Sequence, residues 1–269
     1  MTTQLTGTRA LVTGGARGLG LRTAREIAQR GGTVVLADID SEAGAEAVAA
    51  LTAEGHTASF VQLDVTDDSS WEAAMAEVVA NGGTINALVN NAGIEISDLL
   101  INLDADNARK VFDVNVLGTA LGIKHAFRAM APGDETRAGG AGGAIVNIAS
   151  VAATIAFPGI AAYSASKSAV QRLTKVAVAE SGRLGYGVRV NTICPGLVPN
   201  AMGTKLAVDM ERLGLFGSVE EAVGAVVGLT PSGRLATEDD IAAGVAFLLS
   251  EDAAFINGVS LSIDGAMGM

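Results

Sequence analysis

The glycine-rich segment at residues 14–20 constrains the fold more than any other feature, because of what lies on either side of it. An apolar run at residues 9–13 precedes it, and an amphipathic run from about Leu19 to Arg30 follows it. Gly14, Gly18 and Gly20 allow a tight turn, let an anion approach the backbone, and permit close packing of helix on strand. The free N–H groups of the helix then face the anion. The segment therefore predicts a strand, a pyrophosphate-binding turn and a helix.

Strand-like and helix-like segments alternate along the rest of the chain. Helices are expected around residues 71–79, from about Asp104 to Met130, around Tyr163 and from about residue 237 to Leu249. Further strands are expected at residues 33–38, 59–65, 85–93, 144–149, 187–196 and 259–265. Such alternation indicates an α/β fold, a parallel sheet with helices on both faces. No repeat or linker indicates a second domain, so residues 1–269 are expected to form one. The glycine-rich stretch from Pro132 to Gly143 is expected to be a mobile loop.

The composition excludes several classes of function. The chain has 29 acidic and 18 basic residues, a net charge of −11, which argues against binding to nucleic acid. No apolar run approaches the ~20 residues that span a bilayer, and the first residues lack a signal sequence. Cys194 is the single cysteine, and His56 and His125 lie far apart in sequence, so no disulfide within the chain and no metal site are expected. A cytoplasmic protein without membrane contact is expected.

Tyr163 and Lys167 are four residues apart in a predicted helix, so they lie on the same face one turn apart. A free tyrosine has a pKa near ~10. A positive charge at ~4–5 Å, in an effective dielectric constant of ~20, is worth about 4 kcal/mol, enough to lower that pKa to about 7. Tyr163 is therefore a candidate acid/base. The alternative is an ordinary turn of an amphipathic helix. Tyr186, the other tyrosine, has no lysine four residues later.

Two polar residues near this pair are candidates for the same site. Ser150 follows the apolar strand at residues 144–149, where its hydroxyl can bind a substrate oxygen. Asn115 lies in the middle of a predicted helix, a poor position for asparagine unless its side chain has a specific partner. A solvated helix face is the alternative for Asn115, although Phe112 and Leu117 are nearby.

Asp38 ends the second predicted strand, 18 residues after Gly20. This is close to the ~20-residue spacing of an acid that binds the adenosine ribose of a dinucleotide. The alternative is that Asp38 caps the helix that begins near Ser41, for which Asp40 is at least as well placed. We favour ribose binding, because the acid belongs to the same fingerprint as the glycines.

From about Leu5 to Gly265 the chain resembles the short-chain dehydrogenase/reductase family. The Thr-Gly-x-x-x-Gly-x-Gly motif of that family falls on residues 13–20, and its Asn-Asn-Ala-Gly motif falls on residues 90–93. Its Pro-Gly pair falls on Pro195 and Gly196. Its catalytic Asn-Ser-Tyr-Lys set falls on Asn115, Ser150, Tyr163 and Lys167. The resemblance implies a single doubly wound Rossmann-type α/β domain with a seven-stranded parallel sheet.

The resemblance also implies a role for each catalytic residue. Ser150 would hold the substrate oxygen and Tyr163 would exchange its proton. Lys167 would bind the nicotinamide ribose and lower the pKa of Tyr163, and Asn115 would hold a water on the proton path. The nicotinamide dinucleotide itself would carry the hydride.

Further residues are expected to bind the cofactor. Asp64 and Val65 would contact adenine, while Asn91 and Gly93 would line the adenosine-ribose side. The remaining cofactor-binding candidates are Gly14, Arg17, Gly18, Leu19, Gly20, Asp38, Tyr163, Lys167, Pro195, Gly196 and Val198. The threonine that the family commonly places after Pro-Gly-x-Val-x is Asn200 here, so either Asn200 or Thr204 is expected to hold the carboxamide.

The substrate is inferred from residues of about 197–230, which we name the lid segment, and from residues near Ser150. Here the side chains are mostly apolar or small: Ile94, Ile96, Ala152, Ala153, Phe157, Met202, Leu206, Met210, Leu213, Leu215 and Phe216. Methionine adapts to varied ligands, and no cluster of Lys or Arg is evident. A bulky apolar secondary alcohol or its ketone, alicyclic or steroid-like, is expected. The alternative is that these side chains form only the core of the lid segment.

The sequence thus predicts an NAD-dependent oxidoreductase. NAD is favoured over NADP because Asp38 would repel a 2′-phosphate. An NADPH-linked ketoreductase, including one that reduces 3-oxoacyl thioesters, is an alternative that Arg17 supports, and a non-catalytic dinucleotide-binding regulator is another. Apolar residues on more than one face of the helices around Asn115 and Tyr163, together with the resemblance, predict a homotetramer or dimer.

Overall fold

The computed structural model describes residues 4–133 and 140–269. Within these residues, seven parallel strands form one sheet in the order β3-β2-β1-β4-β5-β6-β7. The central part of the expected loop from Pro132 to Gly143, residues 134–139, lies outside the described residues. The strands are β1 (Arg9–Thr13), β2 (Thr33–Asp38), β3 (Ala58–Gln62), β4 (Ala87–Asn90), β5 (Gly143–Ile148), β6 (Val188–Pro195) and β7 (Ser260–Ile263).

The chain order of the strands reverses between β1 and β4, which are neighbours in the sheet. From β1 the chain winds outward through β2 to β3, and from β4 it winds the other way to β7. This confirms the doubly wound α/β fold with a seven-stranded parallel sheet. In such sheets ligands bind outside the carboxyl ends of the strands, at the point of reversal.

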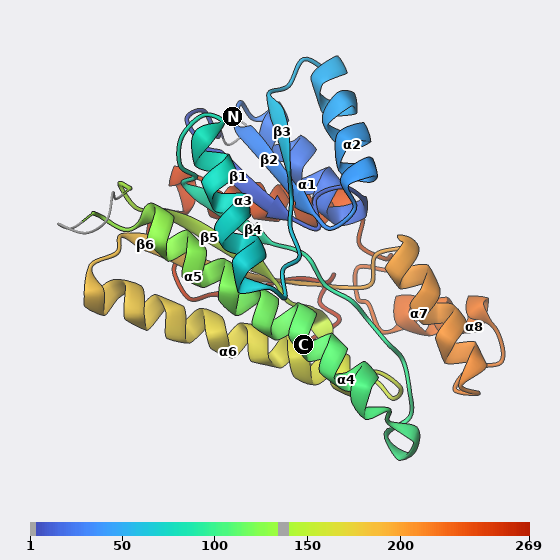
Figure 1. Ribbon diagram of the computed structural model, residues 1–269. Coiled ribbons are helices and arrows are strands. Elements are labelled where there is room, and N and C mark those ends of the chain that lie inside the picture. Colours follow the sequence, from blue (N-terminus) through green and yellow to red (C-terminus); the bar gives the residue numbers. More distant parts are fainter. Residues whose placement is uncertain (1–3, 134–139) are drawn as a thin grey trace.

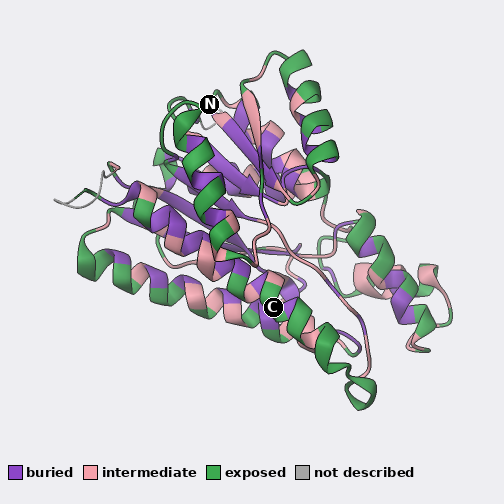
Figure 2. Cartoon of the chain, viewed as in Figure 1, coloured by how far each residue is buried: buried purple, intermediate pink, exposed green. Residues whose placement is uncertain are grey.

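Helices cover both faces of the sheet (Figure 1). Alternate side chains of each strand point to opposite faces, so Val12 and Leu36 belong to one hydrophobic core and Leu11 and Val35 to the other. The first core packs against α1 (Gly18–Gln29), α2 (Ser41–Ala53) and α9 (Glu238–Leu249), the second against α3 (Asp68–Ala80), α5 (Gly118–Met130) and α6 (Ala161–Leu184). Figure 2 shows the sheet buried and the outer faces of these helices exposed.

Side-chain caps define where several helices begin. Asp40 accepts a hydrogen bond from the backbone N–H of Ala43 and caps α2, and Asp67 caps α3 through Ser69. Thr237 and Asp240 form a reciprocal capping box at the start of α9. Each cap satisfies an N–H group that has no partner within the helix.

The long helix expected from Asp104 to Met130 is interrupted in its middle. It consists of α4 (Ala105–Phe112), a π-helical turn η2 (Asp113–Leu117) and α5. A π turn inserts an extra residue into a helix and is frequent at functional sites. Asn115 lies in this turn and is fully buried, so the alternative of a solvated face is wrong.

The lid segment after β6 contains α7 (Ala201–Arg212) and α8 (Val219–Gly228), which lie to one side of the sheet (Figure 1). Their apolar side chains form a third cluster with Ala152 and Ile160. In the part of the chain that is described, no helix is long and apolar enough to cross a membrane.

Candidate active site

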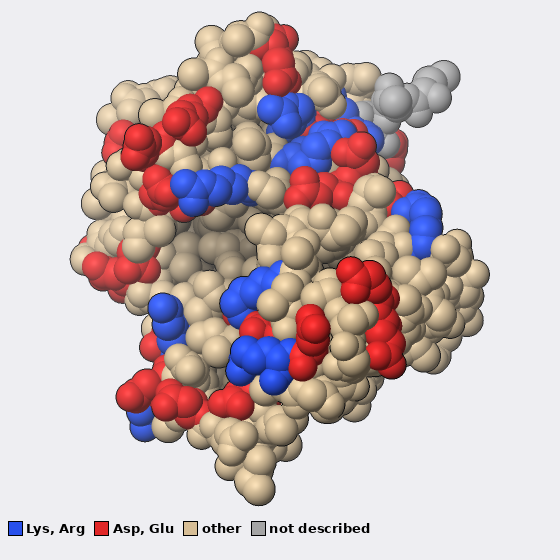
Figure 3. All heavy atoms as spheres, turned by 90° about the vertical axis from the view of Figure 1, so that its right-hand side faces the viewer, with Lys and Arg blue, Asp and Glu red and all other residues tan. Residues whose placement is uncertain are grey.

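A cavity of about 380 Å³ opens at the carboxyl ends of the strands near the point of reversal. The glycine-rich turn lines one side, Ser150, Tyr163 and Lys167 line the middle, and α7 and α8 line the other side. Figure 3 shows the corresponding hollow, with charged side chains of both signs around it. The topology therefore brings together segments that are far apart in the sequence.

The glycine-rich turn has the shape that a dinucleotide phosphate needs. Gly14 and Gly18 have φ angles of +61° and +50°, which side chains rarely adopt, and a Cβ on Gly20 would lie 2.0 Å from the carbonyl oxygen of Gly14. Arg17 precedes α1 without a side-chain cap, so the first N–H groups of the helix are available to an anion. Gly14, Arg17, Gly18, Leu19 and Gly20 all line the cavity, so the residues present fit a bound dinucleotide.

Asn91 braces this turn. Its side-chain amide donates to the carbonyl oxygens of Thr13 (3.0 Å) and Gly14 (3.2 Å), and the Thr13 hydroxyl accepts from the N–H groups of Asn91 and Ala92. The loop after β4 is thus tied to the loop after β1. Asn91 and Gly93 both line the cavity, as do Pro195, Gly196 and Val198.

Asp38 lies at the end of β2 beside the glycine-rich turn. Its carboxylate accepts hydrogen bonds from the backbone N–H groups of Ala16 and Asp40, each at 3.2 Å. Asp40 is the cap of α2, so the alternative in which Asp38 caps that helix is wrong. Asp40 also binds the guanidinium of Arg17 at 2.5 Å, although Arg17 remains largely exposed.

Asp64 and Val65 follow β3 and do not line the cavity, and neither do Asp38, Asn115 or Thr204. The Asp64 carboxylate accepts from the backbone N–H and the hydroxyl of Thr66, and the carbonyl of Val65 accepts from the Trp71 indole at 3.1 Å. The Val65 side chain packs against Gly118, where a Cβ would come within 2.9 Å of it. These contacts fix the turn that follows β3.

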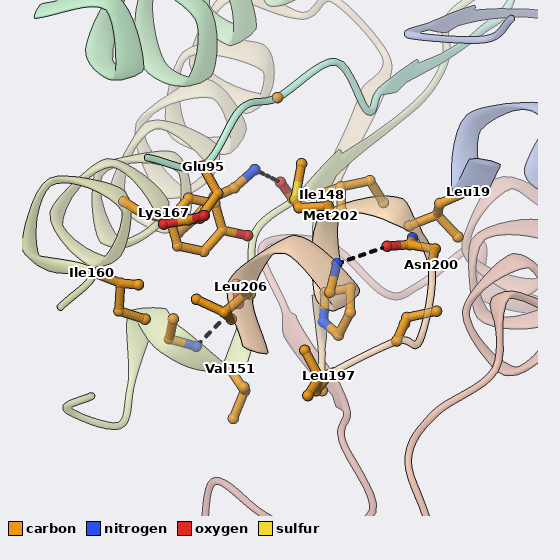
Figure 4. Close-up of a pocket in the computed structure, with 18 of the residues that line it drawn as sticks. Leu19, Glu95, Ile148, Val151, Ile160, Lys167, Leu197, Asn200, Met202 and Leu206 are labelled. Atoms are coloured by element: carbon orange, nitrogen blue, oxygen red, sulfur yellow. Dashed lines mark hydrogen bonds between the residues drawn. The ribbon is translucent and has the colours of Figure 1, made fainter. Parts of the chain in front are cut away.

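Tyr163 and Lys167 lie one turn apart on α6, with the Lys167 ammonium 5.6 Å from the centre of the Tyr163 ring. The ammonium donates to the carbonyl oxygen of Ile148 at 2.8 Å (Figure 4). Ser150 lies at the end of β5, and its hydroxyl accepts from the Ala152 N–H. The structure therefore brings the predicted Ser150, Tyr163 and Lys167 together in one cavity.

The pKa of Tyr163 differs from the lowered value that the spacing predicts. Burial raises the pKa of Tyr163 to about 12, a hydrogen bond with Ser150 acts in the opposite direction, and the charge of Glu95 raises it further. Burial also lowers the pKa of Lys167 to about 8. Desolvation thus outweighs the attraction of a lysine that already bonds to Ile148. Part of the Tyr163 surface remains exposed, and solvent there moderates its shift.

Asn115 joins the loop after β4 to α6. Its side-chain oxygen accepts from the Ile94 N–H, and its amide donates to the Ile94 carbonyl and to the Ser166 hydroxyl, at 2.9 to 3.0 Å. These three bonds connect the segment next to Gly93 with the helix that carries Tyr163. A side chain with this many partners is well suited to holding that helix in position.

Asn200 caps α7 by accepting from the Gly203 N–H at 3.1 Å, and it also lines the cavity. Of the expected substrate-side residues, Ala152, Phe157, Met202, Leu206, Met210 and Phe216 line the cavity. Leu213 and Leu215 instead pack within the third cluster, as the alternative of a lid core predicts, and Ile94, Ile96 and Ala153 do not line the cavity. The apolar lining therefore comes from both the lid segment and the segment after Ser150.

Glu95 is a cavity residue that the sequence analysis missed. It follows Ile94 directly after the Asn-Asn-Ala-Gly turn, and its side chain is only 2% exposed. The only signal for it in the sequence is an acid between two isoleucines. The structure also places Lys205 and Arg212 of α7 around Asp209 near this residue, a charged group that the sequence did not reveal.

Comparisons with known proteins agree with this geometry. The model of the short chain dehydrogenase family matches residues 8–211. The chain is 37% identical to trans-4-hydroxycyclohexanecarboxylate dehydrogenase of Sinomonas cyclohexanicum, covering 95% of this chain and 91% of that one. It is 33% identical to cyclopentanol dehydrogenase of Comamonas testosteroni, covering 95% and 94%.

Among solved structures, a gluconate 5-dehydrogenase from Burkholderia cenocepacia J2315, in complex with NADP and tartrate, superposes with a TM-score of 0.83. The two chains are 31% identical, and the match covers 98% of this chain and 96% of the other. The fold, the glycine-rich turn, the cavity and the family match lead to one conclusion: this chain belongs to the short-chain dehydrogenase family of oxidoreductases.

Proposed function

We propose that this protein interconverts an apolar alicyclic secondary alcohol and its ketone with NAD as the hydride carrier. The observation that carries the proposal is one cavity in which Ser150, Tyr163 and Lys167 stand between the glycine-rich turn and an apolar lid segment. The relatives named for oxidising hydroxycyclohexanecarboxylate and cyclopentanol support a cyclic alcohol. A steroid-like alcohol is the largest substrate that we include in this class.

In this proposal Ser150 and Tyr163 hold the substrate oxygen by hydrogen bonds, and Tyr163 accepts the hydroxyl proton during alcohol oxidation. Lys167 stabilises the phenolate by its positive charge and binds the nicotinamide ribose. The nicotinamide, when bound, supplies or accepts the hydride. Asn115 holds α6 in position next to Gly93, and it lies on the proposed water-mediated proton path.

The proposed dinucleotide contacts are those expected from the sequence. The glycine-rich turn, with Gly14, Arg17, Gly18, Leu19 and Gly20, would hold the diphosphate, and the adenosine side would contact Asp38, Asp64, Val65, Asn91 and Gly93. Pro195, Gly196 and Val198 would contact the nicotinamide side. Asn200 is the better candidate for the carboxamide than Thr204, because Asn200 lines the cavity and Thr204 does not.

We further propose that residues 1–269 act as one domain, in which α7 and α8 of the lid segment close over the substrate. Support comes from the third apolar cluster, in which Leu206 and Met210 of α7 and Val223 of α8 pack near Tyr163.

Cofactor choice gives the test of this proposal. Cyclohexanol and cyclopentanol should be oxidised with NAD at least about 100-fold more efficiently in kcat/KM than with NADP, about 2.7 kcal/mol in the transition state. A 2′-phosphate would face the carboxylate of Asp38 and, behind it, that of Asp40, which already binds Arg17. Asp38→Ala should lower the NAD:NADP ratio of kcat/KM, mainly by improving turnover with NADP.

Asp40→Asn is the matched control, because asparagine still caps α2 while Arg17 loses its charged partner. Because this variant removes one carboxylate and frees Arg17, its NAD:NADP ratio of kcat/KM should fall, but by less than that of Asp38→Ala. Equal use of both cofactors by the wild type would favour the alternative of an NADPH-linked ketoreductase. Absence of turnover with any secondary alcohol or ketone would favour the alternative of a non-catalytic regulator.

A homotetramer, or at least a dimer, is the expected assembly. Phe112, Leu117 and Val176 on the helices α4–α6 and the turn between them are 39%, 44% and 48% exposed, an arrangement that a second copy of the chain would cover. Light scattering at micromolar concentration should give a mass of two or four chains. A monomer at that concentration would refute the assembly.

A further inference from the structure

Glu95 places a carboxylate inside an otherwise mostly apolar cavity. One carboxylate oxygen, Oε1, accepts a hydrogen bond from the Ser97 hydroxyl at 2.6 Å. The other, Oε2, is buried and has no hydrogen-bond partner among the residues that the structure describes. Figure 4 shows Glu95 beside Lys167 in the cavity, which Tyr163 also lines.

The positive charges nearby do not satisfy this oxygen. The Lys205 ammonium is 3.9 Å from Oε2, beyond hydrogen-bonding distance, and it donates to Asp209 instead. Arg212 also binds Asp209, at 3.0 Å, and donates to the Ser97 carbonyl. Asp209 therefore neutralises much of the positive charge that would otherwise compensate Glu95.

A buried acceptor without a donor is costly, and the cost is greatest for a charged group. Burial accordingly raises the pKa of Glu95. Glu95 lines the cavity, so a group bound there would relieve this cost by donating a hydrogen bond to Oε2. A carboxylate on the substrate would be repelled by Glu95, and the mostly apolar lining of the cavity disfavours the burial of an ammonium. A neutral hydroxyl fits both conditions.

We infer that Glu95 Oε2 binds a second hydroxyl of the substrate, so that the preferred substrate is an alicyclic diol, or the matching hydroxyketone, rather than a simple cyclic alcohol. This inference rests on the proposed function, since Ser150 and Tyr163 would hold the hydroxyl that reacts. The apolar lid segment would cover the ring between the two hydroxyls. Hydrogen bonds to a charged acceptor are short and strong, which makes this contact selective.

The test compares the cyclohexanediol isomers with cyclohexanol in steady-state oxidation with NAD. For at least one diol, wild-type kcat/KM should exceed that for cyclohexanol about tenfold or more, as expected for a hydrogen bond to a charged group. A factor of two arises simply because a diol offers two reactive hydroxyls. Glu95→Met, which removes the acceptor and keeps the bulk, should reduce the ratio to about that statistical value.

Comparing kcat/KM for the diol with that for cyclohexanol at a single pH separates recognition of the second hydroxyl from other effects of Glu95. Any change in the pKa of Tyr163 acts on both substrates alike and cancels. Lys205→Met is the matched control, because it removes the charge nearest Oε2 and keeps the acceptor. Its diol preference should stay within about threefold of wild type. If Glu95 served only an ion pair with the lid segment, Glu95→Met and Lys205→Met would both leave the ratio unchanged.

Four results would overturn the inference. The first is a wild-type diol:cyclohexanol ratio of kcat/KM below about three for every diol, and the second is a ratio that Glu95→Met does not lower. The third is a loss of the diol preference in Lys205→Met equal to that in Glu95→Met. The fourth is a preference for hydroxycyclohexanecarboxylate over all diols. Oxidation of cyclohexanol as fast as of the diols would leave the proposed function standing, whereas oxidation of neither would overturn both. Replacing an incompletely paired buried charge by methionine should not destabilise the fold. Glu95→Gln, which keeps a neutral acceptor, should give an intermediate ratio.

Discussion

Replacing Tyr163 by phenylalanine should lower kcat for alcohol oxidation and for ketone reduction by roughly 10²- to 10⁴-fold, the usual value of general acid–base catalysis. The substitution removes one oxygen and leaves the ring in place beside Lys167 and in contact with the third apolar cluster. The Tyr163 phenol, which has a hydrogen bond with Ser150, is the group in the described cavity that would exchange the proton. Its loss therefore removes the proton transfer and preserves the shape of the site.

Binding of NAD, measured by fluorescence titration, should change less than about threefold in Tyr163→Phe, because the glycine-rich turn that would hold the diphosphate is untouched. Tyr186→Phe is the matched control. Tyr186 does not line the cavity and packs against Phe127, with ring centres 5.1 Å apart. This control should keep turnover within about twofold of wild type. A Tyr163→Phe enzyme within tenfold of wild type would refute the role of Tyr163.

Replacing Lys167 by methionine should make the protein more stable and nearly inactive. Turnover should fall at least about 100-fold, because the positive charge that favours the Tyr163 phenolate is lost. At neutral pH the free energy of unfolding should rise by about 2 kcal/mol. Burial lowers the pKa of Lys167 from 10.5 to about 8, which corresponds to a cost of about 3 kcal/mol for burying the ammonium. The lost hydrogen bond to Ile148 removes about 1 kcal/mol of the gain.

The gain in stability should depend on pH in a defined direction. Below about pH 8, Lys167 is charged in both the folded and the unfolded chain, and the whole cost is present. Between about pH 8 and 10.5 the folded chain binds fewer protons than the unfolded one, so wild-type stability rises towards that of the variant. Burial is the main cause of the raised pKa of Tyr163 and is common to both proteins, so most of its contribution cancels in the difference.

Urea-induced unfolding of both proteins at pH 7 and at pH 10.5 measures this difference. Lys175→Met, an exposed position on the same helix, is the control and should change stability by less than about 0.5 kcal/mol and turnover by less than twofold. A Lys167→Met protein that is less stable than wild type at pH 7, or a gain that persists at pH 10.5, would contradict the assigned cost of the buried charge.

The order of strands and helices, the glycine-rich turn and several helix starts follow from the sequence alone. Each depends on residues that are close together in the chain. Period-two burial separates Leu11 from Val12, positive φ angles require glycine at positions 14 and 18, and Asp40 caps the helix that begins one residue later. These local signals agree with the fold that the whole chain adopts. The motif pattern also predicted that Ser150, Tyr163 and Lys167 would share a site, and all three line one cavity.

Only the tertiary structure decided the electrostatics of the site and the partners of its polar groups. The spacing of Tyr163 and Lys167 predicts attraction, but burial governs both pKa values, and burial depends on segments that pack from elsewhere in the chain. Asn115 finds its partners 21 and 51 residues away. Glu95 lies near Lys205, which is 110 positions later in the sequence. Neither the unpaired carboxylate oxygen of Glu95 nor its place in the cavity can therefore be predicted from the residues next to it in the sequence. The local pattern indicated that Ser150, Tyr163 and Lys167 belong to the site, and the meeting of distant loops at the carboxyl ends of the strands added Glu95 and determined how these residues are charged and bonded.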